Sequence, residues 1–201
     1  MKRLTLPLLA VILVATILIS LSLGKYRVPV ADQLGFTDWK LFGLPVPSPE
    51  QQVLLDNILL NIRLPRVLAA AVIGASLSVS GAAFQALFIN PLVSPGLLGV
   101  LAGASFGAAL GMVLSKSWAM VQLSTLAFGF VAVGAALGIA KAYRINSIIM
   151  LVLGGIISGA FFTAMLSIVK YAADPYDQLP AIVYWLMGNL SAVEGKTMLL
   201  I

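Results

Sequence analysis

Residues 63–88 read RLPRVLAAAVIGASLSVSGAAFQALF, and this stretch decides the class of fold. No charged side chain follows Arg66 until well beyond residue 88. A helix that spans a bilayer needs about 20 consecutive, mostly apolar residues. In hydrocarbon the backbone N–H and C=O groups must bond within their own segment, and this stretch shows no strand alternation. The sequence therefore predicts a transmembrane helix here.

The composition extends that interpretation to the whole chain. Of its 201 residues, 61% are hydrophobic and 9% are charged, with a mean hydropathy of +1.07. Soluble domains carry about 25% charged residues. The chain has no cysteine and no histidine, which excludes disulfides, thiolate or imidazole metal sites, and Ser-His or Cys-His nucleophiles. The net charge of +5 is scattered rather than clustered, so no nucleic-acid partner is expected. We predict an all-α, polytopic transmembrane helix bundle.

Five long apolar segments are the expected spans, and together they form one transmembrane domain over residues 1–201. A sixth span is expected to begin near Thr197. The first segment follows Lys2-Arg3, as a signal peptide would, but it is too long and has no small-x-small cleavage site, so we predict a retained helix. The five segments are 4–23, 64–88, 97–114, 118–140 and 145–169.

The longest polar connection is 24–63, which we expect to form an extracytoplasmic loop. Within it, Ser48-Pro49-Glu50-Gln51 reads as a helix start, with Ser as the N-cap, Pro at the first position and Gln completing a capping box. Apolar residues follow at helical spacing, which predicts a short amphipathic helix at the membrane surface that continues into the second span.

The positive charges of the tails and short loops predict the orientation. Cytoplasmic loops carry an excess of Lys and Arg. Lys2, Arg3, Lys141 and Arg144 fall on one side of the membrane, and Lys116 and Lys170 fall on the other. The N-terminus is therefore expected in the cytoplasm.

Small residues recur at every fourth position in the expected spans. Such stripes let helices approach closely in a membrane, where the hydrophobic effect does not drive helix association. They predict a compact bundle. The stripes are Gly99, Gly103, Gly107 and Gly111; Gly74, Ser78, Ala82 and Ala86; Gly134 and Gly138; and Gly155 and Gly159.

The spans lack the chemistry of an ion-driven carrier or a nucleotide site. No carboxylate occurs from Val67 to Val169. Proton- or sodium-coupled carriers usually keep such a group at membrane depth. Gly195-Lys196-Thr197 resembles the end of a phosphate-binding loop, but position 190 is Leu rather than Gly. We expect no cofactor or metal, and an energy source outside this chain.

Two arginines flank the start of the second span. Arg63 and Arg66 lie one turn apart at a helix N-terminus, where the helix dipole disfavours cations. One explanation is anchoring at the interface, with the charged heads reaching for water. The other is a binding role.

A family resemblance favours the second explanation. Residues 63–107 carry RLPR, S-G-A-x-x-Q, N-P-L-x-x-P and G-L-L-G-V, and 184–188 read YWLMG. In this order, the motifs closely resemble the FecCD-type permeases of ABC importers, the family that includes the cobalamin permease BtuC. The resemblance covers most of 60–190.

The resemblance implies a ten-helix permease subunit in the cytoplasmic membrane, working as a dimer with two ATPase subunits and a substrate-binding protein. It implies that Arg63 and Arg66 dock acidic residues of the binding protein, and that Ser158 and Thr163 are weak candidates for the translocation path. Structural roles are implied for the remaining motif residues. These are Gln85, Asn90, Pro91, Pro95, Gly96 and Gly99.

Family members have about four more helices and a cytoplasmic coupling helix that this sequence does not contain. The sequence therefore leaves two functions open. One is an importer permease for ferric siderophores, haem, cobalamin or molybdate-type anions, with ATP hydrolysis in a partner. The other is a truncated, non-transporting membrane protein, a scaffold or a remnant. A membrane-embedded enzyme fits poorly, because no acid, His or Cys lies in the spans.

Overall fold

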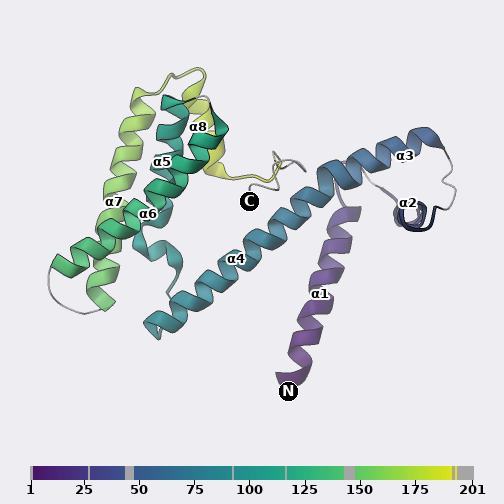
Figure 1. Ribbon diagram of the computed structural model, residues 1–201, viewed down its shortest axis with the longest axis horizontal. Helices are drawn as coiled ribbons and strands as arrows, with labels where there is room; N and C mark the ends of the chain where they lie inside the picture. Colours follow the sequence, from purple (N-terminus) through teal and green to yellow (C-terminus); the bar gives the residue numbers. More distant parts are fainter. Residues whose placement is uncertain are drawn as a thin grey trace. The chain divides into compact units, whose positions relative to one another are not determined.

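All regular elements that the computed structural model describes are helices (Figure 1). It describes residues 2–26, 28–43, 48–91, 93–115, 117–142, 148–191 and 193. The predicted all-α fold is confirmed. In chain order the elements are α1 (Lys2–Ser22), α2 (Val30–Phe42), α3 (Pro49–Leu55), the π-helix η1 (Asp56–Arg63), α4 (Leu64–Phe88), the 3-10 turn η2 (Pro95–Leu98), α5 (Val100–Leu114), α6 (Trp118–Ala142), α7 (Ile148–Ala172) and α8 (Gln178–Met187).

Four of the described helices are long and apolar enough to cross a membrane. They are α1, the continuous helix from α3 to the end of α4, α6 and α7. Helices α5 and α8 are apolar but shorter, with 15 and 10 residues. All five predicted apolar segments are helical in most of their length. The sixth, near Thr197, lies outside the described residues, as do Lys116 and Arg144.

The third segment differs from the expectation. We expected helix from Leu97, but α5 begins at Val100, because Pro95 opens a 3-10 turn and Gly99 has a left-handed φ of 76°. Fifteen helical residues rise about 22 Å. That is less than the hydrocarbon thickness of about 30 Å.

The chain forms two compact units, one of Met1–Ser76 with Leu190–Ile201 and the other of Leu77–Asn189. We call them the N-terminal unit and the bundle unit. The boundary falls inside α4.

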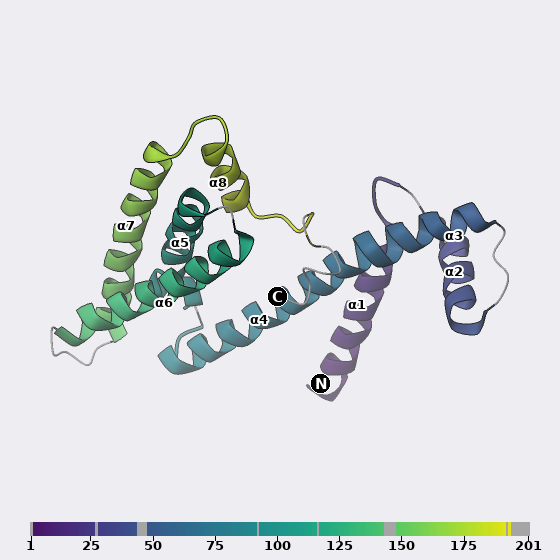
Figure 2. The same cartoon turned by 45° about the horizontal axis from the view of Figure 1, so that its top comes forward.

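In the bundle unit, α5, α6 and α7 lie side by side in both views (Figures 1 and 2). An aromatic cluster sits between them, with the ring centroids of Phe106 and Phe128 4.9 Å apart and those of Phe106 and Phe162 5.7 Å apart. Ile182 of α8, which is 1% exposed, joins the same core. The core thus lies on the inner faces of α5–α8, and the outer faces carry exposed apolar side chains, as lipid-facing helices do.

Glycines set the spacing of these helices. A Cβ added at Gly103 would lie 2.4 Å from the Phe128 carbonyl oxygen, and one at Gly107 would lie 2.3 Å from that of Ser124. The predicted stripe on α5 is therefore a seam against α6, which confirms its packing role. A Cβ added at Gly74, Gly134 or Gly138 would meet no atom within 4 Å in the described structure, so these stripes form no such seam here.

In the N-terminal unit, α2 packs beside α3 and η1, around a small core. That core consists of Val28, Phe36, Leu55 and Leu59. The predicted helix start is confirmed, since the Ser48 hydroxyl accepts the Gln51 backbone N–H at 3.3 Å. Helix α2 was not expected, although Gly43 ends it with a left-handed φ of 69°.

The π-helix η1 follows from Pro65, near the start of α4. In an α-helix the amide of residue 65 would bond to the carbonyl of Asn61, but proline has no N–H and its ring crowds that carbonyl. The chain instead widens to five-residue bonding, and the Leu64 N–H bonds to the Leu59 carbonyl. Helix α3, η1 and α4 thereby continue as one rod across the proline.

Candidate functional site

Arg63, the last residue of η1, binds the end of α1. Its Nη1 donates to the carbonyl oxygens of Leu21 at 2.5 Å and Ser22 at 3.2 Å, and its Nη2 donates to that of Tyr26. The last carbonyls of a helix have no partner within the helix, and a cation there also suits the negative end of the dipole. The last turn of α1 has no basic residue of its own. Arg63 therefore caps α1 from about 40 positions further along the chain.

The segment after α1 is shaped to receive this guanidinium. A Cβ at Gly24 would lie 2.6 Å from Arg63 Nη2. Gln33 of α2 completes the cap, because its Nε2 donates to the Leu21 carbonyl at 3.0 Å and its Oε1 accepts the Ser22 hydroxyl at 2.7 Å. The end of α1 is therefore held by two distant side chains. We call Arg63 and Gln33 the α1 clamp.

Arg66, one turn into α4, has a different environment. Its Nη2 donates to the Ser191 carbonyl at 2.5 Å. Its Nε is buried and has no acceptor in the described part of the chain. A buried donor left unpaired costs about 1–3 kcal/mol, and more when it is charged. Arg66 is therefore half-buried with donor capacity to spare.

Both arginines line one cavity of about 390 Å³ in the N-terminal unit, together with Lys25. The remaining described lining residues are mostly apolar, and none of them is a carboxylate. We call this cavity the cationic pocket. It gathers the two predicted docking arginines, and it adds Lys25, which sequence reasoning treated only as a loop charge.

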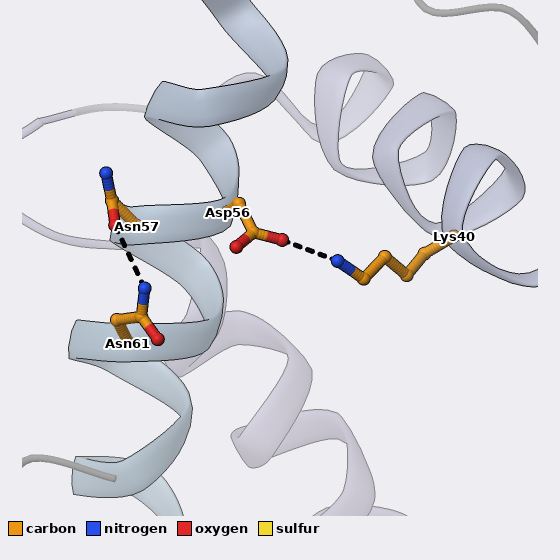
Figure 3. A network of polar contacts seen from close by, with 4 residues as sticks. All are labelled: Lys40, Asp56, Asn57 and Asn61. Atoms are coloured by element: carbon orange, nitrogen blue, oxygen red, sulfur yellow. Dashed lines mark hydrogen bonds and ion pairs between the residues drawn. The ribbon is translucent and has the colours of Figure 1, made fainter.

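Lys40 of α2 shows what a fully paired cation looks like in the same unit (Figure 3). Its Nζ lies 2.6 Å from an Asp56 carboxylate oxygen and 5.1 Å from the centroid of the Trp39 ring. On the same stretch of helix, Asn61 donates to the side chain of Asn57 at 2.9 Å. Lys40 thus has both a counter-ion and an aromatic face.

The motif residues of the α4–α5 connection form a turn that packs against α7. The Asn90 N–H bonds to the Gln85 carbonyl at 3.1 Å, and Ile89 between them has a left-handed φ of 51°. Pro91, Pro95 and Gly96 lead to Gly99. A Cβ on Gly99 would lie 2.8 Å from the Gly159 nitrogen, and a Cβ on Gly155 would lie 1.9 Å from the Leu97 carbonyl oxygen. The turn therefore touches α7 backbone to backbone.

The two weak candidates for the translocation path differ sharply in environment. Ser158 is 2% exposed, and its hydroxyl donates to the Ala132 carbonyl of α6 at 2.8 Å. Thr163 is exposed, and its hydroxyl donates to the Gly159 carbonyl of its own helix at 2.8 Å. Ser158 ties two helices together, whereas Thr163 presents its side chain at the surface of the bundle unit.

Comparison with known proteins identifies the family. The sequence profile of the FecCD transport family matches residues 12–201. The chain belongs to the FecCD transport family. It is 35% identical over 192 residues to the molybdate import permease MolB of Haemophilus influenzae, covering 95% of this chain and 55% of that one. It is 41% identical over 141 residues to the vitamin B12 import permease BtuC of Citrobacter koseri, covering 68% and 41%.

A solved structure supports the same assignment. An inward-facing ABC transporter reported as being of the metal-chelate type superposes with a TM-score of 0.74 at 34% identity, covering 95% of this chain and 55% of that one. The chain thus spans about half the length of the curated relatives it matches. The predicted resemblance and fold class are confirmed, and this is a multi-pass protein of the cytoplasmic membrane.

Proposed function

We propose that this chain forms part of the permease subunit of an ATP-driven importer. The observation that carries the proposal is the FecCD match over residues 12–201, together with the structural match at a TM-score of 0.74. In this proposal the substrate crosses through a cavity between permease subunits, and a separate ATPase supplies the energy. The absence of carboxylates from Val67 to Val169 accords with a carrier that does not couple to protons or sodium.

The proposed substrates are large chelates or oxyanions of the kinds named for the relatives. MolB is named for molybdate, BtuC for vitamin B12, and the solved relative for metal chelates. A deletion strain tests the proposal directly. Uptake of labelled ferric siderophore, haem, cobalamin and molybdate should each be measured with and without the gene. Loss of one uptake activity is expected, restored by the gene in trans. Unchanged uptake of all four would reject the import role and leave the non-transporting alternative.

We further propose that residues 24–63 face outward and the N-terminus faces inward. The charge bias of the short loops supports this orientation. The chain has no cysteine, so single cysteines at Asp38 and Ala142 can be labelled with a membrane-impermeant thiol reagent in intact cells. Labelling at position 38 and protection at position 142 are expected. The reverse pattern would invert the topology.

The third part of the proposal is that Arg63 and Arg66 dock acidic residues of a substrate-binding protein. Arginine offers a planar fork that pairs with carboxylates through two bonds, which lysine cannot reproduce. Arg63 already binds three carbonyls, whereas the one hydrogen bond of Arg66 between described residues goes to the Ser191 carbonyl, so Arg66 is the arginine with more donors left. Within this proposal Arg63 orders the site and Arg66 makes the contact.

Charge reversal at Arg66 distinguishes docking from interfacial anchoring. Arg66→Glu should abolish capture of the binding protein in detergent while the permease remains folded, and the wild-type interaction should weaken with added salt. Lys40→Glu is the matched control, because Lys40 lies in the same unit and is already paired with Asp56. Unchanged capture by the Arg66→Glu protein would remove docking and leave interfacial anchoring as the role of Arg66.

A further inference from the structure

Among the residues that the structure describes, the cationic pocket has more positive charge than its surroundings neutralise. Lys25, Arg63 and Arg66 line it, and none of the described lining residues is a carboxylate. The only ion pair between described residues joins Lys40 to Asp56, outside this pocket. The Nη atoms of Arg63 donate to backbone carbonyls, which carry no net charge and so do not neutralise the guanidinium. The buried Arg66 Nε still lacks an acceptor. These features together call for an anion.

The position of the pocket indicates which anion. Its lining includes Ser20 in the last turn of α1 and the 23–26 segment that follows, and on the other side it includes the first turn of α4. The candidate span of α1 is Thr5–Ser22. The pocket therefore lies at the end of the candidate span of α1. With the second span beginning near Leu64, as the sequence predicts, this is the depth at which lipid headgroups and their phosphates sit.

The walls of the pocket suit an amphiphile rather than a free ion. Leu23, Ile58, Ile62 and Val67 contribute apolar surface beside the cations. The cavity of about 390 Å³ falls within the usual range of about 300–1,000 Å³ for small-molecule sites. None of the α1 span is buried in the described structure, so an acyl chain attached to a headgroup here has an apolar helix to lie along.

We propose that the cationic pocket binds the phosphate headgroup of an anionic phospholipid. The guanidinium of Arg66 and the Lys25 Nζ are the donors to the phosphate oxygens, Arg63 holds the α1 end that forms one wall, and the acyl chains follow α1. This inference does not depend on the import function or on docking.

The test uses the purified 201-residue chain, delipidated in neutral detergent and then incubated with defined lipid. The probes are phosphatidylglycerol, which is anionic, and phosphatidylcholine, which has no net charge. Lipid retained after size-exclusion chromatography is quantified by mass spectrometry. We expect phosphatidylglycerol to be retained far above phosphatidylcholine. Each basic residue near a membrane surface contributes about fivefold to anionic-lipid attraction, so Lys25→Gln/Arg66→Gln should bind roughly 25-fold more weakly.

Two comparisons keep the result interpretable. Lys40→Gln removes a cation of the same unit that is paired elsewhere, and it should leave retention unchanged. Lys25→Gln alone alters an exposed loop side chain and should lower retention about fivefold with the thermal unfolding midpoint unchanged. This single variant decides the matter if the double variant fails to fold.

Four outcomes would overturn the proposal. Equal retention of both lipids, or equal retention by wild type and the Lys25 variant, would show that no specific headgroup site exists. Displacement of phosphatidylglycerol by millimolar inorganic phosphate would assign the pocket to a soluble oxyanion. Displacement of phosphatidylglycerol by a micromolar acidic peptide, with the peptide itself not displaced by excess phosphatidylglycerol, would assign the pocket to an acidic protein partner.

Discussion

The bundle unit and the N-terminal unit solve the same packing problem in opposite ways. In the bundle unit, α5 and α7 lack side chains at the contacts, so Gly103, Gly107 and Gly155 meet neighbouring backbone directly. In the N-terminal unit, α1 buries none of its span and is held at its end by the α1 clamp. Close packing of backbones holds the helices of the bundle unit, whereas a few hydrogen bonds hold α1 in the N-terminal unit.

This difference determines where each unit is vulnerable. Packed helices cannot absorb an added methyl group, because interiors are dense and their backbones rigid. A helix held at one end tolerates changes along its faces but depends on the few residues that hold it. Substitutions should therefore destabilise the bundle unit by overpacking and the N-terminal unit by removing hydrogen bonds.

The largest effect is expected from Gly155→Ala in α7. The new Cβ would lie 1.9 Å from the Leu97 carbonyl oxygen and 2.8 Å from Leu98 Cα, so the turn must move away from α7. Overpacking of this kind costs about 1–3 kcal/mol or more. We expect a marked loss of monodisperse protein and a lower thermal unfolding midpoint in detergent.

Gly134→Ala is the matched control, since it is also a mid-helix glycine and its Cβ would meet no atom within 4 Å. Alanine is favoured over glycine in a helix by about 1 kcal/mol, so this variant should be neutral or slightly more stable. Equal effects of the two substitutions would show that the contact between the turn and α7 does not determine stability.

The next largest effect is expected from Arg63→Gln in the α1 clamp. The variant loses charged hydrogen bonds to the end of α1. Because Gln33 still binds that turn, we expect the loss to stay local and to lower the global unfolding midpoint less than Gly155→Ala does. Hydrogen exchange of the amides in the last turn of α1 should accelerate, while α5–α7 stay protected. Unchanged exchange in that turn would mean that Gln33 alone suffices to cap α1.

A smaller effect is expected from Ser158→Ala. It removes the bond to the Ala132 carbonyl, and hydrogen bonds between membrane helices contribute about 0.6 kcal/mol on average. Thr163→Ala removes only a bond within its own helix and should leave the unfolding midpoint unchanged. A transport defect in Thr163→Ala with normal stability would support its proposed place on the translocation path.

The smallest effect is expected from Lys40→Gln. Exposed ion pairs contribute about 0.2–1 kcal/mol and weaken with salt. The difference in unfolding midpoint between wild type and variant should therefore shrink as salt is added. A large, salt-independent loss would show that the contact of Lys40 with the Trp39 ring, rather than the Asp56 carboxylate, holds α2.

The sequence predicted features that depend on local pattern. Hydropathy located the long helices, Ser48 marked a helix start, and the spacing of Gly103 and Gly107 marked a seam. Helix α2 carries local signals too, with Asp32 in its first turn and Gly43 at its end, but its 13 residues are too short and too mixed in polarity for hydropathy to mark it.

Other features could not be predicted because they depend on distant residues. Nothing near Arg63 indicates that its partners are carbonyls about 40 positions earlier, and nothing near Arg66 indicates Ser191. The same spacing repeats at Gly134 and Gly138 without a partner helix in the described structure, so a stripe alone does not identify its neighbour.

The π-helix before Pro65 also sets a rotational phase. Residues bonded over five positions advance less around the axis than residues of an α-helix, so η1 changes the direction in which Arg63 and Arg66 face relative to α3. The core contacts of Leu55 and Leu59 fix the helix before the proline, and Arg63 and Arg66 follow within two turns of Leu59. Pro65 thus determines, through the π-helix that precedes it, that both arginine side chains face the cationic pocket.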